Sequence, residues 1–257
     1  MPGSRILLLA VDCETTRFLI PALQAAFSLE RIILEEPPSR IKMLRKRARR
    51  QGWWVAVGQA LFRLAVVPLL AREAAHRIAA IKNTYGLEDK GLPEALVTRV
   101  VSANSAEATR LLQETNPDAV VVNGTRILSA EVLGSVPAPF ANIHAGITPL
   151  YRGAHGGYWA LAQRNADACG VTVHLVDKGV DTGGILQQAL IQPGPRDNFC
   201  TYPLLQYGVG IPLLVQSLSR VLAGDLTLQR SRDGASRLWS HPTLWGYVSN
   251  RLFLGVK

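Results

Sequence analysis

The sequence is poor in cysteine and in charge. It has only three cysteines among 257 residues, far apart and without a CxxC spacing, which argues against a disulfide framework and against a metal held by cysteines. We therefore expect reduced, buried thiols at Cys13, Cys169 and Cys200. Charged residues make up 18% of the chain and hydrophobic residues 48%, which excludes a disordered protein. A chain of this length can bury a large core, either as one domain with an appendage or as two small domains.

Three other sequence signals are missing. The first apolar run, 6–11, ends at Asp12 and is too short for a signal peptide, so we expect a cytoplasmic protein. The turn that ends this run reads AVDCE, and because it has no glycine it argues against a dinucleotide bound at the first helix. In the apolar stretch after the second predicted strand, the uncharged pieces 51–62 and 64–71 fall short of the roughly 20 residues that a membrane-spanning helix needs.

What is present is an alternation of strand-like and helix-like segments. Short apolar runs typical of strands lie at 6–11, 31–34, 97–101, 118–122, 140–143, 170–176 and 185–191. Helical spacing lies at 15–27, 104–115, 128–133, 158–164 and 202–222, with Asn104 and Glu107 in capping-box spacing. This alternation predicts an α/β fold, with a Rossmann-like, mostly parallel sheet and helices on both faces. We expect a catalytic domain at 1–200 with a helical insertion at 39–82, followed by a C-terminal helix and a short appendage at 201–257.

Polar side chains follow one of these strands and a later turn. Asn142 and His144 end the apolar run that begins at Phe140, and Asp181 lies in a turn followed by Gly183. An amide can bind a carbonyl oxygen, an imidazole can move a proton, and a carboxylate can hold a ring nitrogen in place. Open α/β sheets place such side chains at the mouths of their strands. Taken singly, each is also typical of a turn or of a satisfied polar group, and for Asp181 an Asx-turn is the alternative.

Four ordered motifs between residues 118 and 192 resemble the formyltransferase family that uses 10-formyltetrahydrofolate. They are NIH at 142–144, PLYRG at 149–153, GVTVH at 170–174 and VDTG at 180–183. The family includes glycinamide ribonucleotide formyltransferase, methionyl-tRNA formyltransferase and the sugar N-formyltransferases. The resemblance is weaker before residue 97 and after residue 200.

The resemblance implies roles for single residues. It implies that Asn142 donates to the formyl oxygen, that His144 stabilises this oxygen or accepts the proton of the amine, and that Asp181 orients His144 or binds a water. It places at the folate, with no metal, the residues Gly124, Arg126, Ile127, Leu128, Val180 and Asp181. It places at the amine substrate the residues Tyr151, Arg152, Gly153 and His174, although His174 has plain packing as an equal alternative. The chain departs from the family at Arg126, where a small or polar residue is expected, at Gly146, often Ser, and at Thr148, often Leu.

The motifs do not account for the insertion. Residues 40–50 read RIKMLRKRARR, with seven basic and no acidic residues, while the whole chain has a net charge of +9. Ile41, Leu44 and Ala48 form an apolar stripe, so the segment is predicted to be a basic amphipathic helix, and the Trp53-Trp54 pair follows. Three interpretations stay open: a solvated helix that covers an apolar patch, peripheral contact of residues 40–71 with an anionic membrane, or binding of a polyanionic substrate.

We therefore expect a folate-dependent N-formyltransferase, an enzyme that moves a formyl group from 10-formyltetrahydrofolate to a primary amine. The favoured acceptor is an amino sugar carried on a nucleotide or a lipid, because the residues after Cys200 are too few for the C-terminal β-barrel that the resemblance implies for the tRNA enzyme. Nucleic acid is accordingly not the expected partner, and a homodimer is left open. The alternatives are another small amine, an aminoacyl-tRNA, a formyltetrahydrofolate deformylase, and a non-catalytic folate-binding or membrane-docking module. We expect a cytoplasmic location, with membrane association left open.

Overall fold

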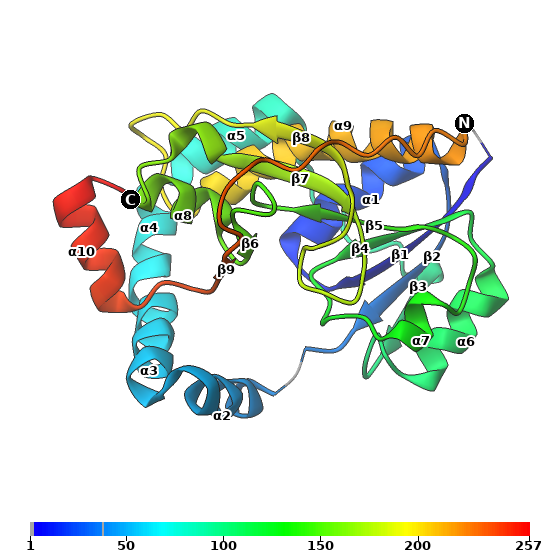
Figure 1. Ribbon diagram of the computed structural model, residues 1–257, viewed down its shortest axis with the longest axis horizontal. Coiled ribbons are helices and arrows are strands. Elements are labelled where there is room, and N and C mark those ends of the chain that lie inside the picture. The colour runs from blue at the N-terminus through cyan, green and yellow to red at the C-terminus, as the bar shows by residue number, and fades with distance from the viewer. Residues whose placement is uncertain (1–2, 38) are drawn as a thin grey trace.

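Seven strands form the central sheet of the protein. In the computed structural model, which describes residues 3–37 and 39–257, they lie in the order β3-β2-β1-β4-β5-β7-β8 (Figure 1). The strands are β1 (Arg5–Val11), β2 (Ser28–Glu35), β3 (Val97–Val100), β4 (Ala119–Asn123), β5 (Phe140–His144), β7 (Gly170–Leu175) and β8 (Ile185–Leu190). The first five pair in parallel, and β7 runs antiparallel to both β5 and β8. The prediction of a mostly parallel sheet is confirmed.

Helices cover both faces of this sheet (Figure 1). One layer contains α1 (Glu14–Ala26), α5 (Ala75–Tyr85) and α9 (Tyr202–Leu222), and the other contains α6 (Ala106–Thr115) and α7 (Ala130–Leu133). Because successive side chains of a strand point to opposite faces, Ile6 and Leu8 of β1 join the first layer's core, and Leu7 and Leu9 join the second's. Central strands buried on both faces in this way are typical of a Rossmann-like α/β fold, as predicted.

The start of α6 corrects one prediction. The N-cap is Ser105, whose Oγ accepts a hydrogen bond from the Ala108 amide at 3.2 Å, and not Asn104. Both residues are good caps, and the tertiary structure gives Asn104 another task. Its side chain donates to the Ile127 carbonyl at 2.9 Å and accepts from the Ser129 amide at 2.8 Å. Asn104 thus fixes the loop that follows β4.

The predicted helical insertion is present. It consists of α2 (Arg40–Gln51), α3 (Trp53–Leu61), a π-helical turn η1 (Phe62–Val66) and α4 (Val67–Glu73), and α5 follows. Pro68 does not end the helical run, because it lies in the first turn of α4, directly after the π-helical turn. The run from Trp53 to Glu73 is therefore one continuous rod, long and apolar enough to cross a membrane by length and composition alone.

The rod packs by one side into a third apolar cluster. Phe62 and Leu70 are buried there against α8 (Gly156–Ala162) and the C-terminal helix α10 (Leu244–Leu254), which was not predicted. Between α9 and α10 the chain forms β9 (Leu238–Trp239), which pairs in parallel with β6 (Arg152–Gly153). Two short 3-10 turns, η2 (Glu94–Leu96) and η3 (Ala166–Ala168), complete the helices of the described chain. The division of the chain at residue 200 stays a prediction, and α9 itself packs in the first layer.

The three cysteines are unpaired, but only one of them is buried as expected. Cys169 is buried, and Cys13 and Cys200 are half-buried. Burial raises the pKa of Cys169 to about 12 and that of Cys200 to about 11, so both are protonated thiols at neutral pH.

Candidate active site

A cavity of about 320 Å³ lies at the carboxyl ends of β1, β4 and β5. The strand order reverses between β1 and β4, and such a switch point is where open α/β sheets bind ligands. Of the residues singled out from the sequence, those that line this cavity are Gly124, Arg126, Ile127, Leu128, Asn142, His144, Gly153, His174, Val180 and Asp181.

Strand register brings three of these side chains together. Asn142 and His144 are two residues apart on β5, so both point to the same face, while Ile143 between them packs in the core. The antiparallel partner β7 places His174 directly opposite Asn142, and Asn142 Nδ2 lies 3.1 Å from His174 Nε2. The Nδ1 atom of His174 lies 2.6 Å from the Leu175 carbonyl, which only accepts, so this nitrogen carries the proton and Nε2 accepts from Asn142.

Asp181 reaches the same point from the loop between β7 and β8. Its backbone has φ 50°, a left-handed conformation that aspartate tolerates better than most residues. One carboxylate oxygen accepts from the Gly153 amide at 2.8 Å and lies 3.4 Å from His144 Nδ1. The other lies 3.5 Å from Asn142 Nδ2 and from His174 Nε2. The carboxylate therefore connects all three side chains.

The two ring nitrogens of His144 have different environments. Nε2 lies 2.7 Å from the Tyr151 carbonyl and must donate to it, so Nδ1 is the free nitrogen of the neutral ring and faces Asp181. Burial lowers the pKa of His144, although the Asp181 charge and the Tyr151 hydrogen bond oppose the shift. His144 is thus uncharged at neutral pH, and it gains a carboxylate partner when Nδ1 takes up a proton.

Asp181 stays ionised in spite of its burial. Burial raises its pKa, but the nearby imidazoles of His174 and His144 and the hydrogen bond from the Gly153 amide outweigh this effect and lower the pKa to about 2. A buried, ionised carboxylate beside a neutral imidazole is an arrangement that can hold a proton on the imidazole while a reaction proceeds.

The loop 124–129 forms the opposite wall of the cavity. Glu35 at the end of β2 is buried, and its carboxylate accepts from the Ala103 amide at 2.8 Å and from the Arg126 amide at 2.9 Å. The Arg126 guanidinium also pairs with this carboxylate. The departure from the family pattern at Arg126 is therefore matched by Glu35, and both help to fix the loop whose apolar side chains, Ile127 and Leu128, line the cavity.

Two residues expected at the amine substrate lie elsewhere. Tyr151 is buried, stacks on Trp239 and contributes its carbonyl to His144, and it does not line the cavity. Arg152 donates to the Val180 carbonyl at 3.0 Å and so ties β6 to the loop that carries Asp181. Gly153 is positioned by the C-terminal segment, because its neighbours Arg152 and Ala154 donate to carbonyls of residues 237 and 239.

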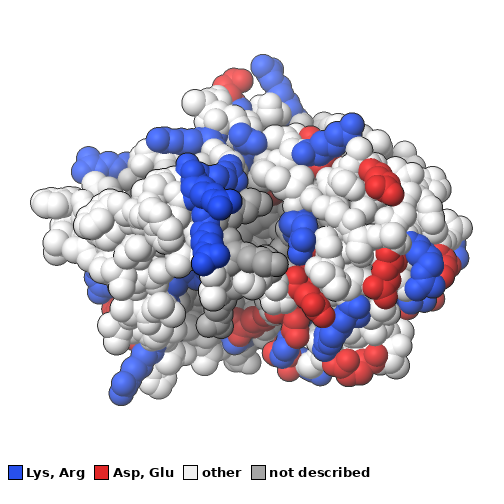
Figure 2. Space-filling view, turned by 90° about the horizontal axis from the view of Figure 1, so that it is seen from below, with Lys and Arg blue, Asp and Glu red and all other residues white. Residues whose placement is uncertain are grey.

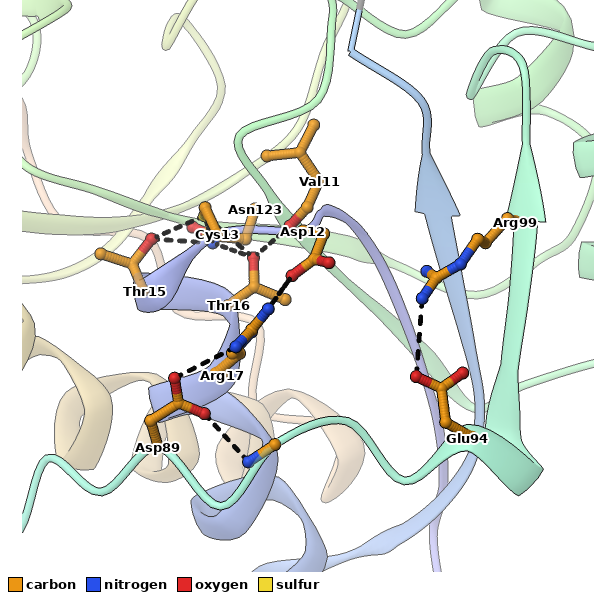
Figure 3. A network of polar contacts seen from close by, with 11 residues as sticks. Val11, Asp12, Cys13, Thr15, Thr16, Arg17, Asp89, Glu94, Arg99 and Asn123 are labelled. Atoms are coloured by element: carbon orange, nitrogen blue, oxygen red, sulfur yellow. Dashed lines mark hydrogen bonds and ion pairs between the residues drawn. The ribbon is translucent and has the colours of Figure 1, made fainter.

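Sequence reasoning missed a polar network at the opposite corner of the cavity. Asn123, at the end of β4, donates to Thr16 Oγ1 at 2.8 Å and accepts from Tyr207 at 2.6 Å. Figure 3 shows Asn123 reaching the start of α1, where Cys13, Thr15 and Thr16 gather and Arg17 links Asp12 to Asp89. Thr15, Asn123 and Tyr207 line the cavity. The one sequence signal was the position of Asn123 directly after a buried strand.

A second cavity of about 530 Å³ adjoins the first, and Arg126 and Gly153 line both. Its walls come from the insertion and from the C-terminal segment. The residues that line it are Met43, Arg47, Arg50, Gln51, Gln59, Arg126, Gly153, Ala154, Leu238, Trp239, Ser240 and His241. The Arg237 guanidinium lies over the Trp239 ring at 4.6 Å. Arginines beside a tryptophan can bind an anionic group together with a ring.

A half-buried histidine pair supports this second cavity. His155 Nε2 lies 2.8 Å from His241 Nδ1, so one ring donates to the other. Burial, with the charges of Arg63 and Arg47, lowers the pKa of His155 to about 4. Burial, the neighbouring His155 and the same two arginines lower that of His241 to about 2. The described residues contain no cluster of three or more His, Cys, Asp or Glu side chains placed to hold a metal ion.

Comparisons with known proteins find similar sequences and similar folds. A family model described as formyl transferase matches residues 70–201. A methionyl-tRNA formyltransferase of Kosmotoga olearia is 32% identical over 128 residues, which are 49% of this chain and 41% of that protein. The chain thus spans less than half the length of this relative.

Solved structures share the fold at low sequence identity. Glycinamide ribonucleotide transformylase 1 from Symbiobacterium toebii has a TM-score of 0.58 at 18% identity, covering 93% of this chain and 95% of that one. A sugar N-formyltransferase from Shewanella has a TM-score of 0.54 at 14% identity, covering 90% of this chain and 73% of that one.

Proposed function

The chain belongs to the formyl transferase family, and on this premise we propose that it transfers a formyl group from 10-formyltetrahydrofolate to a primary amine. The observation that carries the proposal is the convergence of Asn142, His144 and Asp181 at one wall of the first cavity. An amide donor, a neutral imidazole and an ionised carboxylate are the groups that acyl transfer to an amine requires.

The opposite wall of this cavity fits the folate ring of the donor. Main-chain groups of the loop 124–128 and the apolar side chains of Val122, Ile127, Leu128 and Val180 surround a space of suitable size for a ring system. Gly124 has φ 72°, and a Cβ there would meet Val11, so the loop is built close against β1 and leaves the cavity open. These residues would hold the donor with its formyl carbon toward Asn142.

The residues of the chain supply three actions in the transfer. The amine nitrogen bonds to the formyl carbon, and the bond from that carbon to the folate nitrogen then breaks as this nitrogen takes up the proton that the amine has lost. Asn142 Nδ2 donates to the formyl oxygen, on which negative charge develops. The Nδ1 atom of His144 takes the proton that the amine loses, because Nε2 already donates to the Tyr151 carbonyl. Asp181 stabilises the resulting imidazolium.

We propose an amino sugar carried on a phosphate group as the acceptor. The second cavity supports this, because it adjoins the first at Gly153 and offers Arg47 and Arg50 to an anion and Trp239 to a ring. The basic helix α2 is thereby explained as one wall of an acceptor site. The similarity to methionyl-tRNA formyltransferases favours an aminoacyl-tRNA as the second candidate, and the same arginines would suit its phosphates.

The test is incubation with 10-formyltetrahydrofolate and three acceptor classes: nucleotide-linked amino sugars, lipid-diphosphate-linked amino sugars and methionyl-tRNA. Mass spectrometry should detect the gain of one formyl group on an amino sugar. The His144→Ala variant should lose about 10²- to 10⁴-fold in rate and retain donor binding, because the imidazole moves a proton and does not hold the folate. Formate release without an acceptor would reveal a deformylase instead, and full activity of the variant would refute the role of His144.

A further inference from the structure

The helical rod Trp53–Glu73 leaves one side bare. Trp53, Trp54, Leu64 and Leu69 are 61%, 72%, 73% and 66% exposed, and Val57 and Leu61 are exposed with them. Trp54, Val57, Leu61 and Leu64 follow helical spacing, so they form one stripe along α3 and η1. Contiguous apolar stripes of this kind mark a surface that meets an apolar partner.

The opposite side of the rod is fixed to the fold. Phe62 and Leu70 are buried, Gln59 donates to the His241 carbonyl at 2.9 Å, and the Leu70 carbonyl accepts from Asn198 at 3.0 Å. Only 28% of the most apolar window is buried, so the fold holds the rod by one narrow side. The described part of the chain therefore leaves the bare stripe exposed.

Basic side chains adjoin this stripe. Helix α2 ends at Gln51, with only Gly52 between it and the rod, and its Arg45 and Arg49 are exposed and line neither cavity. Figure 2 shows Lys and Arg side chains gathered beside a broad uncharged region, which lies at the end of the molecule where Figure 1 places α3 and α10. Helix α10, which packs on α3 and η1, exposes Leu252 and Phe253 by 73% and 79%.

We propose that this surface, made of the bare stripe of the rod and the exposed arginines of α2, docks the protein on an anionic lipid bilayer. The apolar stripe enters the interface between headgroups and acyl chains, the Trp53-Trp54 pair lies at headgroup level, and the arginines meet anionic headgroups. The inference goes beyond the proposed function and does not depend on it. The stripe lies at residues 53–69, outside the matched residues 70–201, so family membership does not account for it.

Two other occupants fit the surface less well. In a twofold dimer the same surface meets itself, so the interface would contain the exposed Arg45 and Arg49 of both copies, and like charges repel. A membrane-spanning rod would have to break the contacts that its Gln59, Phe62 and Leu70 make with the rest of the fold, and would carry Arg63 into the bilayer. A rod that lies on the membrane keeps every one of these contacts.

The experiment is flotation of the full-length chain with vesicles made of equal parts phosphatidylglycerol and phosphatidylcholine, and with vesicles of phosphatidylcholine alone. We expect flotation with the anionic vesicles only, reduced by salt. The triple variant Trp53→Ser, Leu64→Ser, Leu69→Ser and the double variant Arg45→Glu, Arg49→Glu should each bind the vesicles at least about tenfold more weakly. The matched control Val101→Ser, Leu226→Ser removes exposed apolar side chains elsewhere and should bind like the unaltered protein.

Four outcomes would overturn the proposal. Absence of flotation at low salt, or equal flotation of the variants and the unaltered protein, would show that this surface does not meet lipid. A dimer by light scattering that the triple variant dissociates would assign the stripe to a second copy. Retention in the membrane after an alkaline carbonate wash would indicate a spanning rod. Circular dichroism and donor binding of each variant confirm that it is folded, because none of the substituted residues lines the donor cavity.

Discussion

The lack of a side chain at Gly146 allows His144 to lie close to the Tyr151 carbonyl. A Cβ at this position would lie 2.6 Å from His144 Nε2 and would collide with the Tyr151 carbonyl, the two groups that hydrogen-bond to each other. The serine that the family often has here would need a different path of the loop after β5. We expect Gly146→Ala to displace the imidazole and to lower kcat by about 10²-fold, with donor binding little changed.

Steady-state kinetics and calorimetric titration of the donor measure the two effects separately. Gly194→Ala is the matched control, because a Cβ at Gly194 meets nothing nearer than 3.6 Å and its φ is an ordinary one. If Gly146→Ala keeps full kcat, the hydrogen bond from His144 to the Tyr151 carbonyl is not what orients the base.

The charge of Asp181 determines the direction in which the pH dependence of kcat/KM should shift when this residue is replaced. His144 must be uncharged to accept a proton, and burial lowers its pKa below the ordinary 6.5, so protonation of His144 should lower kcat/KM only beneath pH 6.5. The Asp181 charge raises the pKa of His144, and Asp181 is itself ionised across this range because its pKa is lowered to about 2. Asp181→Asn should therefore move the acid limb to still lower pH and lower the plateau, since the imidazolium loses its partner.

The comparison of pH–rate profiles with the same acceptor isolates this effect, because the acceptor amine titrates identically with both proteins. An acid limb that moves to higher pH in Asp181→Asn would contradict the arrangement. A limb that does not move would mean that a group other than His144 governs it.

The site residues that could be recognised from the sequence are those that contrast with the residues next to them in the chain. Asn142, His144 and Asp181 stand out because each is polar beside an apolar run or a glycine turn. Asn123 and Tyr207 do not, because their roles depend on each other across 84 positions of sequence. The pairing of Glu35 with Arg126 could not be predicted for the same reason. This pairing gives Arg126, which departs from the family pattern, a role in fixing one wall of the cavity.

At the scale of elements, the pair His155–His241 joins the start of α8 to the segment after β9. Both folded-state pKa values, about 4 and about 2, lie below the ordinary 6.5, chiefly because of burial. Above pH 6.5 both rings are neutral whether the chain is folded or not. As the pH falls below 6.5 the unfolded chain takes up protons first, so stability should fall by at most about 1.4 kcal/mol per pH unit for each ring.

Urea unfolding at about pH 7 and at about pH 5 measures this loss. The double variant His155→Asn, His241→Asn should lose less stability between the two pH values, and asparagine tolerates the left-handed φ of 60° at position 155. His76→Asn, on the exposed side of α5, is the control and should leave the loss unchanged. An equal loss in the double variant would show that the pair is not what titrates.

Elements with a strong period were predictable, and those held by tertiary contacts were not. Residues 202–222 were predicted as a helix, and α9 has the same bounds in spite of Gly208 and Pro212. Helix α10 was missed because its apolar side chains face both inward, as Tyr247 does, and outward, as Phe253 does, so no single stripe is visible. The two-residue strands β6 and β9 carry no sequence pattern, yet their pairing positions Gly153 against Asp181.

At the scale of the whole molecule, the positive charge is concentrated on α2, the helix to which we assign two functions. Seven basic residues lie within 40–50, and without them the net charge of +9 would be +2. Arg47 and Arg50 line the second cavity, and Arg45 and Arg49 on the same helix are exposed and do not line it. One helix thus supplies a wall of the proposed acceptor site and the basic part of the proposed docking surface.

Because the two pairs of arginines face different surfaces, we expect their substitutions to have different effects on acceptor binding and on vesicle binding. Arg47→Ala, Arg50→Ala should raise KM for a phosphate-bearing acceptor by about tenfold or more, because each charge-assisted hydrogen bond is worth roughly 1.5–3 kcal/mol, and should leave vesicle binding less affected. Arg45→Ala, Arg49→Ala removes the same charge and should leave KM for a soluble, nucleotide-linked acceptor unchanged while weakening vesicle binding. With a lipid-linked acceptor in vesicles, both variants should lose activity, since the substrate is then met only at the membrane. If both variants change KM for the soluble acceptor equally, the effect is one of net charge, and the second cavity is not the acceptor site.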